Sequence, residues 1–227
     1  LEGIARNPRH RVLVLDGHDA RLFQGEGHRL VEVRTGGFPV HVDPPHEQDT
    51  PQKDRPIHEE AEREEHRIVY RAVDDALDAA CRADPLPLVV TGTQRELVLF
   101  EEVTAHGGQV VGRLGGNHRR SHPAELTTAV RPVLEAHLAT EQAAVLERLQ
   151  EAHGRERAVF GLREVKDAAA EGRGHLLVVE EGFTVPGHWT DGLTPGDSPD
   201  ERLDDLDEVV DDVIETVLLA GGQVEFV

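Results

Sequence analysis

The chain has 227 residues, 44 of them acidic and 24 basic, and its formal net charge is −20. This charge opposes nonspecific attraction to phosphate backbones and argues against DNA as a partner. No stretch approaches the ~20 apolar residues that a membrane helix needs, and the first residues do not resemble a signal peptide. We therefore expect a soluble cytoplasmic protein with no membrane partner. The lack of methionine, also at position 1, suggests a piece of a longer protein.

Short apolar runs and turn signals alternate in the first part of the sequence. Residues 12–16, 20–24 and 30–34 predict three strands in an antiparallel meander, because glycine-containing turns separate them. Residues 36–56 contain five prolines and few apolar side chains, which is typical of a long exposed loop. The pattern then predicts a helix over 57–82, a strand over 86–91, a helix over 95–106, a strand over 110–114 and a helix over 123–153.

This order of elements indicates an RNase H-like mixed-sheet domain, an α/β fold in which two parallel strands extend the meander. Pro132 is expected to kink or interrupt the last helix. The remaining sequence predicts a smaller three-layer α/β domain, and we place the two domains at 1–145 and 146–227. The expected elements of the smaller domain are a strand over 158–160, a helix over 162–171, a strand over 175–180, a helix over 203–219 and a strand over 223–227.

The tripeptide Gly-Gly-Gln occurs at residues 107–109 and again at residues 221–223, each time between a helix pattern and a strand pattern. Glycine ends helices readily because it adopts the left-handed conformation without a Cβ penalty. We therefore predict that both copies are structural helix stops. Gln109 and Gln223 would then be the first residues of buried strands.

Several segments carry a resemblance to a known family. Residues 158–165, 174–181 and 217–227 resemble the C-terminal domain of archaeo-eukaryotic peptide release factors and of Pelota, which has the kink-turn-binding fold. Residues 11–139 are similar to the middle domain of that family, which is RNase H-like without nuclease activity. Residues 88–92, 115–117 and 123–126 look most like the third family of its bacterial branch.

The resemblance implies a release loop that begins at Gly36, Gly37 and Phe38. Phe38 stands where the release factors have a glutamine, and it cannot form the hydrogen bonds that orient a water. The resemblance thus implies a ribosome-associated protein of the rescue or hibernation type that binds and does not hydrolyse. Its partners would be ribosomal RNA, with tRNA and a translational GTPase as further candidates. The RNA contacts expected are Arg9, Arg11, Lys53, Arg55, Arg119 and Arg120.

Two other classes of function stay open. Asp16, at the end of the first predicted strand, has the position of a metal-binding carboxylate in RNase H-like nucleases, but Thr91-Gly92-Thr93 supplies no acidic companion. A protein-interaction scaffold is the other alternative. The histidines match neither a metalloprotease pattern nor a cysteine-containing zinc site. We therefore expect no catalytic residue, no metal ligand and no cofactor.

Overall fold

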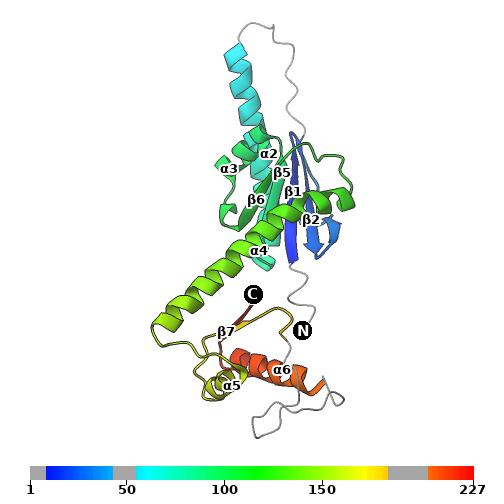
Figure 1. The fold of residues 1–227 in the computed structure, drawn as a ribbon. Coiled ribbons are helices and arrows are strands. Elements are labelled where there is room, and N and C mark those ends of the chain that lie inside the picture. The colour runs from blue at the N-terminus through cyan, green and yellow to red at the C-terminus, as the bar shows by residue number, and fades with distance from the viewer. Residues whose placement is uncertain (1–8, 43–54, 184–203) are drawn as a thin grey trace. The chain divides into compact units, whose positions relative to one another are not determined.

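The computed structural model describes residues 9–42, 55–183 and 204–227 (Figure 1). The chain divides into two compact units, and the division falls between Leu138 and Ala139, inside helix α4 (Pro123–Gly154). Each unit has a β-sheet of its own. Among the described residues, no helix is long and apolar enough to cross a membrane.

The first unit is built on a six-stranded mixed sheet with the strand order β3-β2-β1-β5-β6, and β4 pairs with β2 beside β3. The first three strands form the predicted antiparallel meander, and β5 and β6 extend it in parallel with β1. The mixed sheet expected from the sequence is confirmed. The bounds of the strands are β1 (Arg9–Asp16), β2 (Asp19–Glu26), β3 (Arg29–Val33), β4 (Val40–His41), β5 (Leu88–Gly92) and β6 (Val110–Gly115).

Two cores cover the two faces of this sheet, because successive side chains of a strand point to opposite faces. Leu13 and Leu15 of β1 belong to the core that also contains residues of α2 (Arg55–Ala83) and α3 (Gln94–Val103). Val12 and Val14 belong to the core that contains residues of α4. All four side chains are at most 2% exposed. The first unit therefore has helices against both faces of its sheet.

Helix α4 packs closely on the sheet at β6. A Cβ atom placed on Gly112 would lie 2.1 Å from Cγ1 of Val133, so the missing side chain leaves the space that α4 fills. The helix continues from Pro123 to Gly154 with Pro132 in its interior. Pro132 therefore does not interrupt the helix, and a kink at this residue stays a prediction.

The second unit contains α5 (Leu162–Ala170), β7 (Leu176–Val179), α6 (Asp204–Leu219) and β8 (Gln223–Phe226). Strands β7 and β8 pair in parallel, and apolar side chains of α5, α6 and both strands pack together. The predicted strand over 158–160 is wrong. Phe160 is 52% exposed and packs edge-on against His153, so the segment is apolar but has no strand partner in the described structure.

The second Gly-Gly-Gln copy ends helix α6 as predicted. Gly221 has a positive φ of 81°, its N–H donates to the carbonyl of Leu218, and the N–H of Gly222 donates to the carbonyl of Val217. This pair of hydrogen bonds is a Schellman motif. Gln223 then begins β8, but its side chain is exposed and not buried as the sequence predicted.

We predict that Gly222→Ala destabilises the protein while Gln223→Ala does not. A Cβ atom on Gly222 would lie 2.6 Å from the carbonyl oxygen of Gly174 and 2.6 Å from Cγ1 of Val217. We expect the free energy of unfolding in urea to fall by about 1–3 kcal/mol for Gly222→Ala and to change by less than about 0.5 kcal/mol for the exposed Gln223→Ala. Equal losses in both variants would contradict a purely structural role of the glycine pair.

Candidate functional site

The segment that corresponds to a release loop starts with a tight turn against helix α2. Gly36 and Gly37 have positive φ angles of 64° and 95°, and a Cβ atom on Gly37 would lie 3.1 Å from Cβ of Ala76 in α2. Phe38 follows them with only 5% of its surface exposed, inside the core shared by the sheet and α2. The expectation of an exposed loop over residues 36–56 is therefore wrong at Phe38 and Val40, which are buried, whereas Gly36 and Gly37 are exposed as expected.

This arrangement assigns a packing role to the Gly-Gly-Phe sequence. The glycines allow the chain to pass close to α2, and the phenyl ring fills the core beside Val40. An aromatic hydrocarbon side chain has no hydrogen-bond donor or acceptor. Phe38 therefore cannot orient a water molecule. Residues 43–54, which include Lys53, lie outside the described residues.

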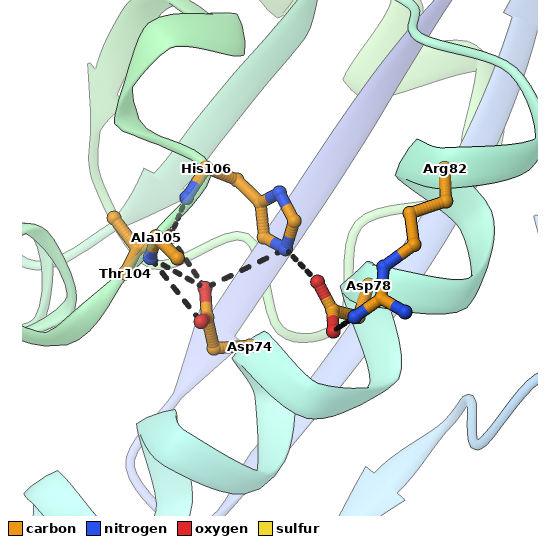
Figure 2. A network of polar contacts seen from close by, with 6 residues as sticks. All are labelled: Asp74, Asp78, Arg82, Thr104, Ala105 and His106. Atoms are coloured by element: carbon orange, nitrogen blue, oxygen red, sulfur yellow. Dashed lines mark hydrogen bonds and ion pairs between the residues drawn. The ribbon is translucent and has the colours of Figure 1, made fainter.

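The first Gly-Gly-Gln copy lies beside a polar network that joins α2 to the end of α3 (Figure 2). The hydroxyl of Thr104 donates to Asp74 Oδ1 at 2.6 Å, and the N–H of Ala105 lies 3.2 Å from both oxygens of that carboxylate. Nε2 of His106 is 3.1 Å from Asp78 Oδ1, and Asp78 is also paired with Arg82. The chain that leads into this copy is thus anchored on α2.

The glycines of this copy do not end the helix. Helix α3 stops at Val103, and Gly107–Gln109 forms a separate 3₁₀ turn before β6, without a positive φ at either glycine. The predicted left-handed stop is therefore wrong here, since Asp74 holds the backbone that follows α3. Gln109 belongs to the turn and is not the first residue of a buried strand.

A charged edge forms where strand β1 ends. Nε of Arg119 lies 2.7 Å from Oδ2 of Asp16, and Nη2 of Arg119 lies 3.5 Å from Oδ2 of Asp19. The imidazole of His41 pairs with the other oxygen of Asp19. These side chains line a cavity of about 250 Å³ together with Arg21 and other residues of the sheet. With Glu32, which also lines the cavity, the edge brings two arginines, one histidine and three acidic side chains together.

Arg21 and Glu32 complete this edge, although the sequence did not identify them as site residues. Nε of Arg21 donates to Glu32 Oε1 at 2.7 Å, its Nη1 donates to the carbonyl of Arg119 at 3.0 Å, and its guanidinium lies 4.7 Å from the centre of the Phe23 ring. The hydrogen bond from Arg21 lowers the pKa of Glu32. Arg21 therefore fixes the loop that carries Arg119 to the surface of β2.

Glu96 is a further acidic residue that the sequence analysis missed. Its carboxylate accepts hydrogen bonds from the N–H of Gly17 and from the N–H of Thr93, each at 2.6 Å. The spacing Thr93-x-x-Glu96 is a capping box and predicts the second bond. The bond to Gly17 joins residues 79 positions apart, and local spacing does not predict it.

Glu96 supplies the acidic neighbour that Asp16 lacked in the sequence. Burial raises the pKa of Asp16, the charge of Arg119 lowers it, and the charges of Glu96 and Asp19 raise it again. The part of the chain that the structure describes contains no group of three or more histidine, cysteine or acidic side chains placed to hold a metal ion. The charge of Asp16 is balanced by an arginine.

The predicted RNA contacts are divided between the two ends of β1. Arg119 contacts Asp16 at the C-terminal end of the strand. Helix α2 approaches that end at His66, whose ring lies 5.7 Å from the ring of His18, and the helix begins eleven residues earlier, at Arg55. Arg120 is exposed beside Arg119. Arg9 begins the strand at the opposite end and pairs with Asp84 at 2.5 Å.

Arg11 does not have the exposure that an RNA contact needs. Its side chain is 4% exposed, and its guanidinium donates to the carbonyls of Asp84 and Ala80 at 2.6 and 3.2 Å. These carbonyls belong to the C-terminal end of α2, where a cation is favourable. This arrangement removes Arg11 from the set of expected RNA contacts.

Residues 9–173 match the family described as bacterial archaeo-eukaryotic release factor family 3. The match includes well over half of the chain, and the protein therefore belongs to this family. The resemblance stated from the sequence is confirmed, and membership supports a role connected with translation. The curated proteins contain no match to this chain.

The chain is also similar to solved structures of release-factor-like proteins. An archaeal translation termination factor, aRF1, matches with 14% identity and a TM-score of 0.35, over 96% of this chain and 56% of that protein. Pelota from Archaeoglobus fulgidus matches with 16% identity and a TM-score of 0.40, over 97% of this chain and 57% of that protein. The chain thus spans a little more than half the length of these proteins.

We predict that Arg119→Ala raises the pKa of Asp16 further, because it removes the largest favourable charge on a carboxylate that burial already disfavours. The pKa of Asp16 in the folded protein is above its unfolded value. Its contribution to stability is therefore fully present below about pH 4 and is lost as the pH rises through the folded pKa. Carbon-detected NMR titration of the Asp16 carboxyl measures this change.

The control for that titration is Arg113→Ala, which removes an exposed arginine paired with Glu101 at 2.5 Å. This variant should leave the Asp16 titration unchanged. An unchanged or lower Asp16 pKa in Arg119→Ala would show that the ion pair does not govern the carboxyl.

Proposed function

We propose that the protein is a ribosome-associated, release-factor-like protein of the rescue or hibernation type, which acts by binding and not by hydrolysing peptidyl-tRNA. Family membership supports the link to translation. The observation that carries the non-hydrolytic part is the burial of Phe38 directly after Gly36 and Gly37.

The chemistry of release supports this proposal. Hydrolysis of the peptidyl-tRNA ester needs backbone and side-chain groups that orient an attacking water and stabilise the developing negative charge. Phe38 has no polar group, and its ring packs in the core. The two Gly-Gly-Gln copies serve as connections from a helix to a strand, in a 3₁₀ turn and in a Schellman motif.

The domain assignments belong to the same proposal. The strand order β3-β2-β1-β5-β6, with a meander followed by two parallel strands, supports an RNase H-like middle domain at 1–145. The order α5, β7, α6 and β8 supports a kink-turn-binding C-terminal domain at 146–227.

The proposed partner is ribosomal RNA, with tRNA and a translational GTPase as further candidates, and the proposed location is the cytoplasm. RNA contacts would come from Arg9, Lys53, Arg55, Arg119 and Arg120. Support comes from the placement of Arg119 and Arg120 together in the loop at one end of the sheet. Because the chain carries a net charge of −20, such local basic groups would have to govern its approach to RNA.

A metal-dependent nuclease is the second candidate, and the neighbouring carboxylates of Asp16 and Glu96 favour testing it. We expect no cleavage of single-stranded or duplex RNA or DNA in Mg²⁺ or Mn²⁺, because Arg119 already balances the charge of Asp16. Gel analysis of the incubated nucleic acids measures the outcome. Cleavage that disappears in Asp16→Ala would establish the nuclease instead.

The binding proposal predicts that Lys53→Glu with Arg55→Glu weakens the association of the full-length protein with ribosomes. The logarithm of the affinity falls as the logarithm of the salt concentration rises, and each lost phosphate contact should make this slope less steep by about one unit. The free energy of unfolding should stay nearly unchanged, since substitutions away from packed cores usually shift it by less than about 0.5 kcal/mol. Sucrose-gradient sedimentation with ribosomes at several salt concentrations measures the effect.

The matched control is Arg131→Glu with Arg148→Glu, which makes the same change in net charge at two exposed positions of α4. It should sediment with ribosomes nearly as the wild type does. Equal losses of ribosome binding in both double variants would show that the change in net charge alone causes the effect. Failure of the wild-type protein to bind ribosomes in any growth state would favour the protein-interaction scaffold.

A further inference from the structure

Arg119, one of the proposed RNA contacts, is occupied by acidic groups of its own chain. Its guanidinium faces Asp16 at 2.7 Å and Asp19 at 3.5 Å. The contact between Nε of Arg119 and Oδ2 of Asp16 does not have the geometry of a hydrogen bond. The two groups therefore attract each other as opposite charges. The side chain of Arg119 is 55% exposed, and water and external anions can reach it.

The loop that carries Arg119 is held independently of this ion pair. The carbonyl of Arg119 accepts a hydrogen bond from Arg21 at 3.0 Å, and the backbone N–H of Arg119 donates to Asn117 Oδ1 at 3.2 Å. The N–H of Ser121 donates to the carbonyl of His118 at 3.1 Å. The guanidinium can therefore change its partner while the backbone of the loop keeps its place.

Arg119 also lines a second cavity of about 510 Å³, on the side of the loop that carries Arg120 and Ser121. Turned toward this cavity, it would place two arginines beside the first turn of α4, where the helix dipole favours an anion. Glu125 lines the cavity as well, and its carboxylate accepts a hydrogen bond from the N–H of His122 at 3.0 Å. The negative charge of this acid repels any anion that enters the cavity, so the two arginines have to outweigh it.

We propose that Asp16 and Asp19 compete with RNA phosphates for Arg119 and thereby set the affinity of this loop for RNA. The proposal rests on the RNA-binding part of the proposed function. The side chain of Asp16 is only 20% exposed, but that of Arg119 is 55% exposed, so a phosphate can approach the guanidinium from solvent while the carboxylates keep their place. Release of Arg119 leaves Asp16 beside the negative charges of Asp19 and Glu96 without its cation, which opposes release.

The test compares Asp16→Asn with Asp19→Asn against a matched control, Glu135→Gln with Glu147→Gln on the exposed surface of α4. Both double variants remove two negative charges. Binding of an oligouridylate of about 12 nucleotides is followed by fluorescence anisotropy over a range of salt. We expect the aspartate variant to bind about fivefold more tightly than the control, with a salt slope steeper by about 0.7.

Addition of Arg119→Ala to the aspartate variant should abolish the gain. If thermal unfolding shows that the double variant is not folded, Asp19→Asn alone replaces it and should give a smaller gain of the same kind. A gain equal to that of the control, a gain that survives Arg119→Ala, or no oligonucleotide binding by any variant would overturn the proposal.

Ribosome sedimentation separates this proposal from the proposed function. A gain in oligonucleotide binding without ribosome association would overturn only the ribosomal role. Ribosome association without the gain would overturn only the competition at Arg119.

Discussion

Burial of strand β1 on both faces is the constraint on which the first unit depends. Val12 and Val14 face one core, Leu13 and Leu15 face the other, and none of the four is more than 2% exposed. Such a strand requires cover on both sides, because each apolar side chain contributes about 1.5–3 kcal/mol when it is withdrawn from water. Helices α2 and α3 cover one face and α4 covers the other, and the loops at the strand's C-terminal end are thereby brought together.

The charged edge at that end is a consequence of this packing. Asp16 is the last residue of β1, and the loop before α4 brings Arg119 beside it because α4 packs across the same face of the sheet. Arg21 of β2 fixes the loop from its other side. Charges that lie far apart in the chain thus balance one another at the surface.

Packing also explains the conformations of this protein's glycine pairs. Glycine serves three different purposes in them: a close approach to Ala76 at Gly37, a 3₁₀ turn at Gly107–Gln109 and a left-handed helix stop at Gly221. The tripeptide Gly-Gly-Gln therefore has no fixed meaning by itself. Its context decides whether it lies in a connection between buried elements or in a loop that can enter another molecule.

The sequence by itself determined the meander, the parallel strands β5 and β6 and most helix bounds, because apolar periodicity and turn residues are local signals. It also determined family membership. Tertiary structure decided the burial of Phe38, the use of Arg11 at the end of α2, the approach of Glu96 to Gly17 and the absence of a described strand at residues 158–160. Each depends on partners distant in sequence, and neither propensity nor spacing specifies which distant groups meet when a core closes.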